Sequence, residues 1–299
     1  MIKLFDDITV LIIIYNSDQK IFNILKTLAD IKVLVIDNGR NNILINSIKQ
    51  DCPNINIISN KKNIGFAKAV NCGLNIIKTK YVLLLNPDAY INVDSIIKLR
   101  ETFDKYSNTI IAVPSVYNEN IYSAEYGLLP EQSKGIKRNY LEEEISKKLH
   151  KKYPSGDFCV YTFLGSIMMI DRVLLSKIGN FCEDFFMYWE DMELSKRIFN
   201  SKKFSIVLSH EAKAQHLQGT GVKKNFLSNY IKEYHSELSP LIYFKIDKNK
   251  FFLRIKMLKY FLRIFSYLFI LNLKNSIKNM AKFSATFSYI YFNKKVNYK

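Results

Sequence analysis

The chain contains few cysteines, the residues whose disulfide bonds stabilise small extracellular domains. Only four of its 299 residues are cysteines, namely Cys52, Cys72, Cys159 and Cys182. They show no C-x-x-C spacing and no histidine at zinc-finger distance, which argues against a metal cluster or a disulfide framework. We therefore expect buried thiols in a reducing compartment.

A signal peptide and a membrane span are also missing from the sequence pattern. The start, MIKLFDDITV, holds acids where a signal peptide has a basic region and a long apolar run. Near the other end, the longest charge-free run covers residues 264–273, about half of the roughly 20 residues that cross a bilayer. The pattern predicts a cytoplasmic protein, free or peripheral on the cytoplasmic face of a membrane.

Apolar runs and helix-length segments alternate in the first ninety residues. The runs are ITVLIII, KVLVID, INIIS and YVLLLN, and each is almost continuously hydrophobic. Strands covered on both faces have this pattern, so we expect an α/β domain with a doubly wound, mainly parallel sheet flanked by helices. No glycine-rich phosphate loop follows the first run. A bound nucleotide diphosphate would then need another positive charge, most simply a divalent cation held by oxygen ligands.

Polar residues follow the predicted strands, where ligands bind in open α/β sheets. They are Tyr15, Asn16, Asp37, Asn38, Asn60, Asn86 and Asp88. Each is individually explained as a turn former, whereas their recurrence at equivalent positions predicts one shared crevice. Asp88, in YVLLLNPDAYI, is the candidate metal ligand, and His216, in AQHLQGTG, is a candidate second ligand unless it is purely structural.

Three carboxylates lie beside aromatic residues in FFMYWEDMELSKRI, residues 185–198. Desolvation next to aromatic rings raises a carboxylate pKa, so the arrangement indicates either a site or a helix end. For the helix, Leu194 and Ile198 fall on one face and Glu193 can pair with Arg197. The rest of the chain has to decide between the two interpretations.

Taken in order, these motifs resemble a known family. IIIYN, VLVIDNG, NKKNIGFAKAVNCGL, LLLNPDA, the segment from GSIMMID to ELSKR, and HLQGTG are similar to the family 2 inverting glycosyltransferases. The resemblance runs from about Ile8 to about Gly221 and implies a GT-A fold. It is strongest to the bacterial rhamnosyltransferase-like branch that builds surface polysaccharides. One departure, VYTFLGS, puts Tyr161 and Thr162 where relatives often carry acidic or tryptophan residues, which leaves the acceptor open.

The resemblance also implies residue roles. Asp88 and His216 would hold Mn²⁺ or Mg²⁺, and Asp191 would be the general base. Trp189 and Glu190 would contact a glycan or lipid-linked saccharide acceptor. The nucleotide-sugar donor would be bound by Asp88 and by Ile14, Tyr15, Asn16, Asp37, Asn63, Gly65, Ala67 and Asn71. A deoxythymidine-diphosphate rhamnose donor is suggested by the branch, with uridine-diphosphate hexoses as the next choice.

The end of the chain is strongly basic. Of the formal net charge of +17, +12 falls after residue 244, where 13 basic residues face Asp247 alone. We expect a transferase domain at 1–244 and a basic, amphipathic helical tail at 245–299. On one continuous helix, Lys256, Lys259, Arg263 and Lys274 would share a face, which favours an anionic membrane surface. Packing on protein, including homo-oligomerisation, is the alternative.

Other function classes are not excluded by composition. The basic pI of about 9.5 suits a nucleic-acid-binding protein, but no recognisable RNA- or DNA-binding motif appears, so we expect no nucleic-acid partner. A catalytically silent assembly partner with the same fold is a third class. A nucleotidyltransferase fits less well, because its glycine-rich signature is missing.

Overall fold

The computed structural model describes residues 5–39, 41–118, 121–123, 126–127, 129, 156–217, 225–247, 249 and 251–292. The chain forms two compact units, which are described separately below. Unit 1 comprises Met1–Ile64, Lys68–Phe181 and Asp191–Val222, and unit 2 comprises Gly65–Ala67, Cys182–Glu190 and Lys223–Lys299. The boundary expected at residue 245 therefore falls inside unit 2, because the helix before it groups with the helices after it.

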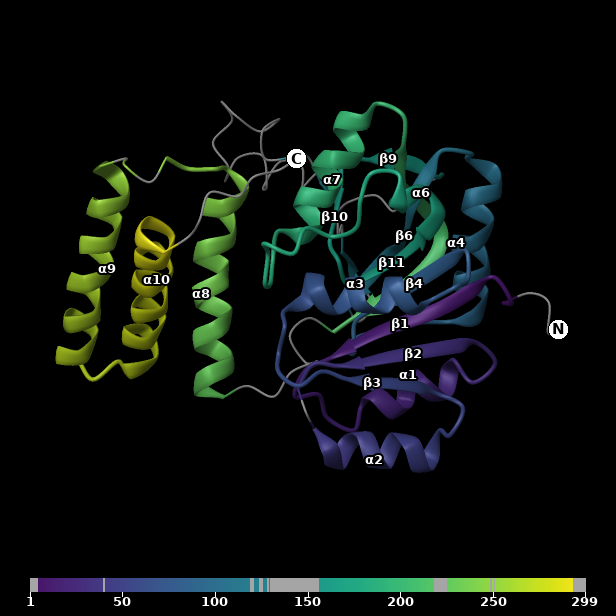
Figure 1. Cartoon of the computed structure of the whole chain (residues 1–299), viewed down its shortest axis with the longest axis horizontal. Helices are drawn as coiled ribbons and strands as arrows, with labels where there is room; N and C mark the ends of the chain where they lie inside the picture. Colours follow the sequence, from purple (N-terminus) through teal and green to yellow (C-terminus); the bar gives the residue numbers. More distant parts are fainter. Residues whose placement is uncertain are drawn as a thin grey trace. The chain divides into compact units, whose positions relative to one another are not determined.

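Unit 1 holds the sheet and the helices that flank it (Figure 1). Its strands are β1 (Ile8–Ile14), β2 (Lys32–Asp37), β3 (Asn56–Ser59), β4 (Tyr81–Leu85), β5 (Ala89–Ile91), β6 (Thr109–Asn118), β7 (Ile121–Ser123), β8 (Tyr126–Gly127), β9 (Phe158–Val160), β10 (Thr162–Phe163), β11 (Ile167–Asp171) and β12 (Ser205–His216). Its helices are α1 (Ile21–Thr27), α2 (Asn42–Asp51), α4 (Val93–Lys105) and α6 (Arg172–Ser176), with most of α3 (Phe66–Ile76) and α7 (Glu190–Ser201).

The main sheet has the strand order β3-β2-β1-β4-β11-β6-β12-β5. Neighbours from β3 to β4 are parallel, as the apolar runs predict. Beyond them, β11 runs antiparallel between β4 and β6, and β12 is parallel to β6 but antiparallel to β5. The sheet is mixed and mainly parallel, as expected from the sequence.

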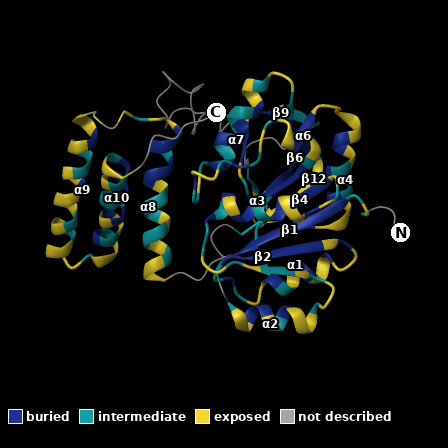
Figure 2. Ribbon diagram, viewed as in Figure 1, coloured by how far each residue is buried: buried dark blue, intermediate teal, exposed yellow. Residues whose placement is uncertain are grey.

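Both faces of the central strands are covered by helices. All of β1 is buried (Figure 2), and alternate residues point to opposite faces of a strand. Val10, Ile12 and their even-numbered neighbours join the apolar cluster formed with α1, α2 and α4, whereas Leu11 lies against Gly73 of α3. A fully buried Ile or Leu side chain stabilises the fold by about 1.5–3 kcal/mol, so this strand anchors the sheet.

Two pairings bring distant parts of the chain to the carboxyl end of β4. The antiparallel β11 begins there, because Ile167 is the register partner of Leu85. In β12, His216 is the register partner of Ala89, which directly follows Asp88. Residues separated by more than eighty positions therefore meet at one edge of the sheet.

One expectation about the core is wrong. The four cysteines were expected to be buried, but Cys159 is exposed and the other three are only half-buried. Cys52 is the C-cap of α2, and Cys182 lies two residues before Asp184, whose carboxylate is 3.5 Å from its sulfur. Cys72 lies within α3 and Cys159 within β9.

Unit 2 is built on three helices, α8 (Phe226–Tyr243), α9 (Phe251–Phe269) and α10 (Leu273–Tyr291), with α10 packed against both others (Figure 1). Every helix that the structure describes is too short or too polar to span a lipid bilayer. Buried Glu237 of α8 accepts a hydrogen bond from the Tyr260 hydroxyl at 2.8 Å and pairs with Lys256 at 2.5 Å. Glu233 pairs with two lysines of α10. The acids of α8 thus hold both neighbouring helices.

Glu237→Ala is expected to lower the free energy of unfolding of unit 2 by about 2–4 kcal/mol, because Lys256 and Tyr260 lose their shared acceptor. Trp189, the single tryptophan, packs on Tyr243 and Phe244 in this unit, so its fluorescence during urea unfolding reports the change. Lys232→Ala, at an exposed position of the same helix, is the matched control. A difference below about 0.5 kcal/mol between the two variants would show that the cluster is not structural.

Candidate functional site

Asn38 is the centre of a hydrogen-bond network at the carboxyl ends of β1, β2 and β3. Its backbone N–H donates to the Ile14 carbonyl at 2.8 Å, and its side-chain amide donates to Asn63 Oδ1 at 2.8 Å. Its own Oδ1 accepts from the Asn60 amide and from the Ile64 N–H, both at 3.1 Å. Two predicted strand-end residues, Asn38 and Asn60, are therefore brought together with two predicted donor residues, Ile14 and Asn63.

Asp37, Tyr15 and Asn16 lie next to this network. The Asp37 carboxylate is buried and accepts from the Gly39 N–H at 2.9 Å. A Cβ atom on Gly39 would lie 2.7 Å from the Asn16 backbone nitrogen, so only glycine allows the ends of β1 and β2 to approach this closely. Asn16 has a φ of 48°, a left-handed conformation that asparagine tolerates.

The small residues predicted to lie under the donor are explained by packing within unit 2. Gly65 has a φ of +88°, and a Cβ atom there would lie 2.7 Å from the Phe186 carbonyl oxygen. The same oxygen accepts from the Phe66 N–H at 2.7 Å, and Ala67 is fully buried. The close approach that requires glycine is thus to the protein's own backbone.

Asn71 also has a structural partner, in unit 1. Its side chain is buried, donates to the Phe181 carbonyl at 2.9 Å and accepts from the Phe181 N–H at 3.1 Å. A side-chain amide that bonds both backbone groups of one residue fixes the position of that residue. Asn71 therefore ties α3 to the segment that precedes the carboxylate cluster.

Asp88 and His216 face each other across the β5–β12 pair. His216 Nε2 lies 3.5 Å from Asp88 Oδ1, and the Asp88 carbonyl accepts from the Leu217 N–H at 3.0 Å. Both side chains are largely buried. No group of three or more histidine, cysteine or acidic side chains is placed to hold a metal in the described ranges. Two protein donors at this separation suit Mg²⁺ or Mn²⁺, which bind through one or two carboxylates, substrate phosphates and water.

Asp191 lies in the first turn of α7, and its carboxylate is held by backbone N–H groups. Gly165 donates to Oδ2 at 3.1 Å, and Met192 donates to Oδ1 at 2.8 Å. Burial raises the pKa of the Asp191 carboxyl above its ordinary value, and these hydrogen bonds oppose the shift. The group is oriented, partly desolvated and more basic than a carboxylate in water.

One turn connects the Asp88 segment with Asp191. Ser166, next to Gly165, accepts a hydrogen bond at 2.9 Å from the backbone N–H of Asn86, two residues before Asp88. The Gly165–Ser166 turn thus contacts the strand exit on one side and the Asp191 carboxylate on the other. Both acids lie at the same edge of the sheet.

Helix α7 is anchored from its far side. Glu193 and Arg197 form the predicted pair, with Arg197 Nε 2.8 Å from Glu193 Oε1, and Leu194 and Ile198 are buried on one face. Arg197 also donates to the carbonyls of residues 178–180 at 2.7–2.8 Å. The helix interpretation of the carboxylate cluster is confirmed, with Glu193 serving the helix and Asp191 left for another role.

Tyr188 and Trp189 precede α7 with φ angles of 66° and 72°. Left-handed backbone is unfavourable for side chains of this size by about 1–2 kcal/mol per residue, so surrounding contacts must hold it. In unit 2 the Trp189 ring lies 5.0 Å from that of Tyr243 and 5.4 Å from that of Phe244. Glu190 is buried.

Comparison with known sequences decides the family. The sequence model described as "Glycosyl transferase family 2" matches residues 9–178, more than half of the chain. The chain belongs to this family. The match covers the strands from β1 to β11, the Asn38 network and Asp88, and it ends before Asp191 and His216.

Two curated relatives of this glycosyltransferase are similar over part of their length. The low-salt glycan biosynthesis hexosyltransferase Agl10 of Haloferax volcanii is 28% identical over 197 residues, which are 64% of this chain and 61% of that protein. An uncharacterized glycosyltransferase of Haemophilus influenzae is 27% identical over 135 residues, 42% of this chain and 41% of that protein. The similarity therefore spans less than two thirds of either relative.

Solved structures share the fold. A crystal structure of GalNAc-T7 with UDP, GalNAc and Mn²⁺ has a TM-score of 0.55 at 16% identity, covering 80% of this chain and 51% of that one. The mannosyltransferase PcManGT from Pyrobaculum calidifontis, in complex with GDP-Man and Mn²⁺, has a TM-score of 0.52 at 15% identity, covering 96% and 76%. The family 2 chain has the GT-A fold expected from the sequence.

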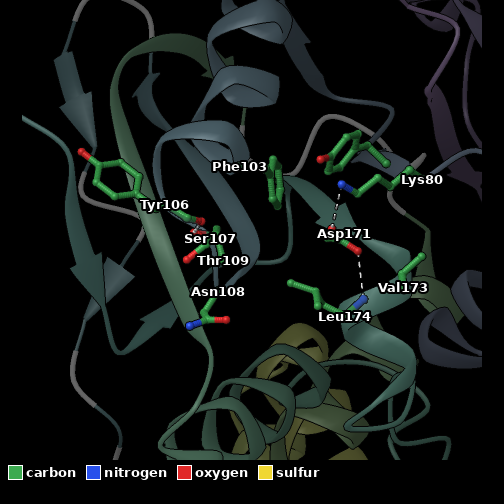
Figure 3. Close-up of a pocket in the computed structure, with 10 residues that line it drawn as sticks. Lys80, Phe103, Tyr106, Ser107, Asn108, Thr109, Asp171, Val173 and Leu174 are labelled. Carbon is green, nitrogen blue, oxygen red and sulfur yellow. Dashed lines mark hydrogen bonds and ion pairs between the residues drawn. The ribbon is translucent and has the colours of Figure 1, made fainter.

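A pocket of about 350 Å³ lies at the other edge of the sheet of this family 2 enzyme (Figure 3). It is lined by Tyr81, the first residue of β4, by Thr109, the first residue of β6, and by Asp171, the last residue of β11. Asp171 is already engaged, since it caps α6 through the Leu174 N–H at 2.9 Å and faces Lys80 at 3.9 Å. The pocket is separated from Asp88 by the length of β4.

Sequence reasoning missed the residues that organise the site. Asn38 was noted only as a strand-end residue, and Gly165 and Ser166 entered only as the GS pair of the VYTFLGS and GSIMMID motifs. Their contribution is made by backbone groups and by an amide that faces other amides, which leave no charge pattern. The signal was the Gly165–Ser166 pair directly before the apolar run that forms β11, because a strand that starts at this edge needs a tight turn before it.

Asp191→Asn is expected to stabilise the folded glycosyltransferase at neutral pH. Below the ordinary pKa of 3.8, the carboxyl is protonated in both the folded and the unfolded chain, so the raised folded pKa has no effect. As the pH rises above 3.8, the unfolded chain releases its proton first, and the wild type loses stability until the folded carboxyl ionises. The melting-temperature advantage of the variant should therefore be small at pH 3.5 and larger at pH 7.

Asp30→Asn, at an exposed turn position, is the control. An advantage of Asp191→Asn that does not grow with pH would contradict the raised pKa.

Proposed function

We propose that the protein is a metal-dependent, inverting glycosyltransferase. It would transfer a sugar from a nucleotide-diphosphate donor to a hydroxyl of a glycan or lipid-linked acceptor in surface polysaccharide synthesis. The observation that carries the proposal is the Gly165–Ser166 turn, which holds a basic, oriented carboxylate at the same edge of the sheet as Asp88 and His216. Family membership and the hexosyltransferase relative support the reaction class.

The donor would bind over the carboxyl ends of β1, β2 and β4. In the proposal Ile14, Tyr15, Asn16 and Asp37 surround the base and ribose, and Asp37 accepts hydrogen bonds from them. Asn63 extends this surface through the Asn38 network. Gly65, Ala67 and Asn71 would act indirectly, because their contacts shape the backbone rather than face open space.

Asp88 and His216 would hold the divalent cation beside the donor diphosphate. The two solved neighbours contain Mn²⁺ with a nucleotide or nucleotide sugar, which supports Mn²⁺ or Mg²⁺ as the metal. Such a cation stabilises the charge that develops on the departing diphosphate, a task that glycine-rich loops perform in other nucleotide-binding folds. Neutral imidazole as one of two ligands favours Mn²⁺.

Asp191 would take the proton of the acceptor hydroxyl. As the hydroxyl oxygen bonds to the anomeric carbon, the bond from that carbon to the diphosphate breaks and its electron pair leaves with the diphosphate. The proton passes to an Asp191 carboxylate oxygen, and the anomeric configuration inverts. The N–H groups of Gly165 and Met192 keep the carboxylate oriented during the transfer. Trp189 and Glu190 remain our candidates for acceptor contacts.

The donor and acceptor are proposed by chemical class. A rhamnosyl donor follows from the resemblance of the motifs, whereas the relatives and neighbours are named for hexose, mannose and N-acetylgalactosamine. A lipid-linked acceptor would place the enzyme on the cytoplasmic face of an anionic membrane, which the basic helices of unit 2 suit.

Asp191→Asn is expected to reduce the turnover number by at least about 100-fold while leaving the donor dissociation constant within about twofold, because only the base is lost. Transfer is followed by release of the nucleotide diphosphate, and donor binding by calorimetry. Glu101→Gln, an exposed position of α4, should change neither. A large loss of donor affinity in Asp191→Asn would contradict the role of Asp191 as the general base.

Asp88→Ala is expected to weaken Mn²⁺-dependent donor binding by at least about tenfold, and His216→Ala to weaken it less, because the carboxylate carries the charge. Thermal shifts with deoxythymidine-diphosphate rhamnose, uridine-diphosphate hexoses and guanosine-diphosphate mannose, with and without Mn²⁺, measure this and identify the donor. Asp94→Ala, at an exposed position of α4, is the control.

An unchanged Mn²⁺ dependence in Asp88→Ala would rule out the metal site. A wild type that binds a donor but transfers to no acceptor would instead support the silent assembly partner.

A further inference from the structure

The outer face of α9 is apolar along its whole length. At 100° per residue, one stripe about 80° wide holds six large apolar residues, each at least 40% exposed. They are Phe251, Ile255, Leu258, Leu262, Phe265 and Phe269. The opposite face carries the two buried residues of the helix, Leu253 and Tyr260. A helix of a water-facing bundle normally carries polar residues on its exposed face, whereas the exposed residues of α9 (Figure 2) include this apolar stripe.

Aromatic contacts extend this face onto α10. Phe261 lies 6.1 Å from Phe283, Phe283 lies 6.2 Å from Phe287, and Phe287 lies 4.7 Å from Tyr291, measured between ring centroids. Phe287 and Tyr291 are 37% and 58% exposed. The two helices therefore present one continuous apolar surface.

The turn between the helices is the most exposed part of this surface. Phe269 is 90% exposed and Leu271 85%, with Ile270 and Leu273 beside them. Leu271 has a φ of 54°, where asparagine or glycine would be less strained. The turn thus exposes a leucine to water and holds its backbone in a strained conformation.

The charges around the surface are all positive. Residues 251–292 contain seven basic residues and no acid. Lys256, Lys278 and Lys282 face the acids of α8, so they are not available to a partner. The other four, Arg254, Lys259, Arg263 and Lys274, are exposed. On the helical projection of α9, Arg254 and Lys259 border the apolar stripe on its two sides. The single helical face expected from the sequence is wrong, because α9 ends at Phe269 and Lys256 points inward.

We propose that this α9–α10 surface, made of the α9 stripe, the aromatic residues of α10 and the turn Phe269–Leu273, inserts into the boundary between head groups and acyl chains of an anionic bilayer. The inference rests on the membrane location in the proposed function and specifies the part that enters the lipid. Apolar faces of interfacial helices lie about 5–10 Å deep, and flanking basic residues then reach the anionic head groups.

A second copy of the chain fits this surface less well. Two such faces would bring Lys259, Arg263 and Lys274 of each copy together, and residues 251–292 offer no acid to compensate. Hydrocarbon accepts the apolar residues without polar partners, and phosphate head groups complement the charge.

Phe269→Gln/Leu271→Asn tests insertion, because both side chains are almost fully exposed and asparagine tolerates the positive φ. Purified full-length protein is sedimented with phosphatidylcholine vesicles containing about 30% phosphatidylglycerol, and with pure phosphatidylcholine vesicles. The double variant is expected to partition at least about tenfold more weakly than the wild type. Ile43→Gln, at an 83% exposed position of α2, should partition as the wild type does.

The double variant Lys259→Gln/Arg263→Gln separates the electrostatic contribution to membrane binding from the contribution of the inserted apolar residues. It is expected to lose the preference for phosphatidylglycerol and to keep the weaker, salt-resistant partition that the apolar turn supplies. Lys26→Gln/Lys49→Gln, on exposed positions of α1 and α2, is the matched control.

Three outcomes would overturn the proposal. They are a wild type that does not bind the anionic vesicles, a turn variant that binds as tightly as the wild type, and a turn variant that changes from oligomer to monomer without lipid. Donor-induced thermal shifts of each variant in vesicle-free buffer are measured in parallel. If the wild type shows no donor-induced shift, the proposed transferase function is contradicted. If the shifts are retained, a negative vesicle result contradicts only the role of the α9–α10 surface.

Discussion

The hydrogen bond from the Gly165 N–H to the Asp191 carboxylate is the contact on which the site depends. It joins a helix that starts near residue 190 to a turn that is itself bonded to the exit of β4. Together with the N–H of Met192, it favours the ionised form of a partly desolvated carboxylate and fixes its orientation. The antiparallel direction of β11 makes the contact available, because a parallel strand would begin at the opposite edge.

The same contact shows how stability and chemistry compete in this enzyme. Burial raises the pKa of Asp191, so the ionised form that accepts a proton is also the form that destabilises the fold. The structure compensates nearby: Arg197 ties α7 to residues 178–180, and Asn71 fixes Phe181. The destabilising ionised carboxylate of Asp191 is therefore surrounded by contacts whose role is to stabilise the fold.

The sequence was sufficient for the sheet and for the helix after Trp189, because continuous apolar runs and a helical face leave few alternatives. It was also sufficient for the proximity of Asp37, Asn38 and Asn60, since parallel strands end together. The sequence was not sufficient where the direction of a side chain, or the end of a helix, depends on residues that are distant in the chain. The Lys256 side chain points inward because it pairs with Glu237, nineteen residues earlier on another helix. The end of α9 at Phe269 is not marked by a proline or glycine in the sequence. Gly65 was assigned to a ligand because Phe186 could not be foreseen.

The consecutive left-handed residues Tyr188 and Trp189 affect how substitutions there must be interpreted. A glycine at either position would remove a ring and relax the backbone at the same time, and the two effects oppose each other. A mild phenotype would then conceal a large loss of contact, whereas an alanine keeps the strain and reports the ring alone. For the segment that leads into Asp191, glycine substitutions therefore underestimate the stabilisation that each aromatic ring contributes, and alanine substitutions measure it.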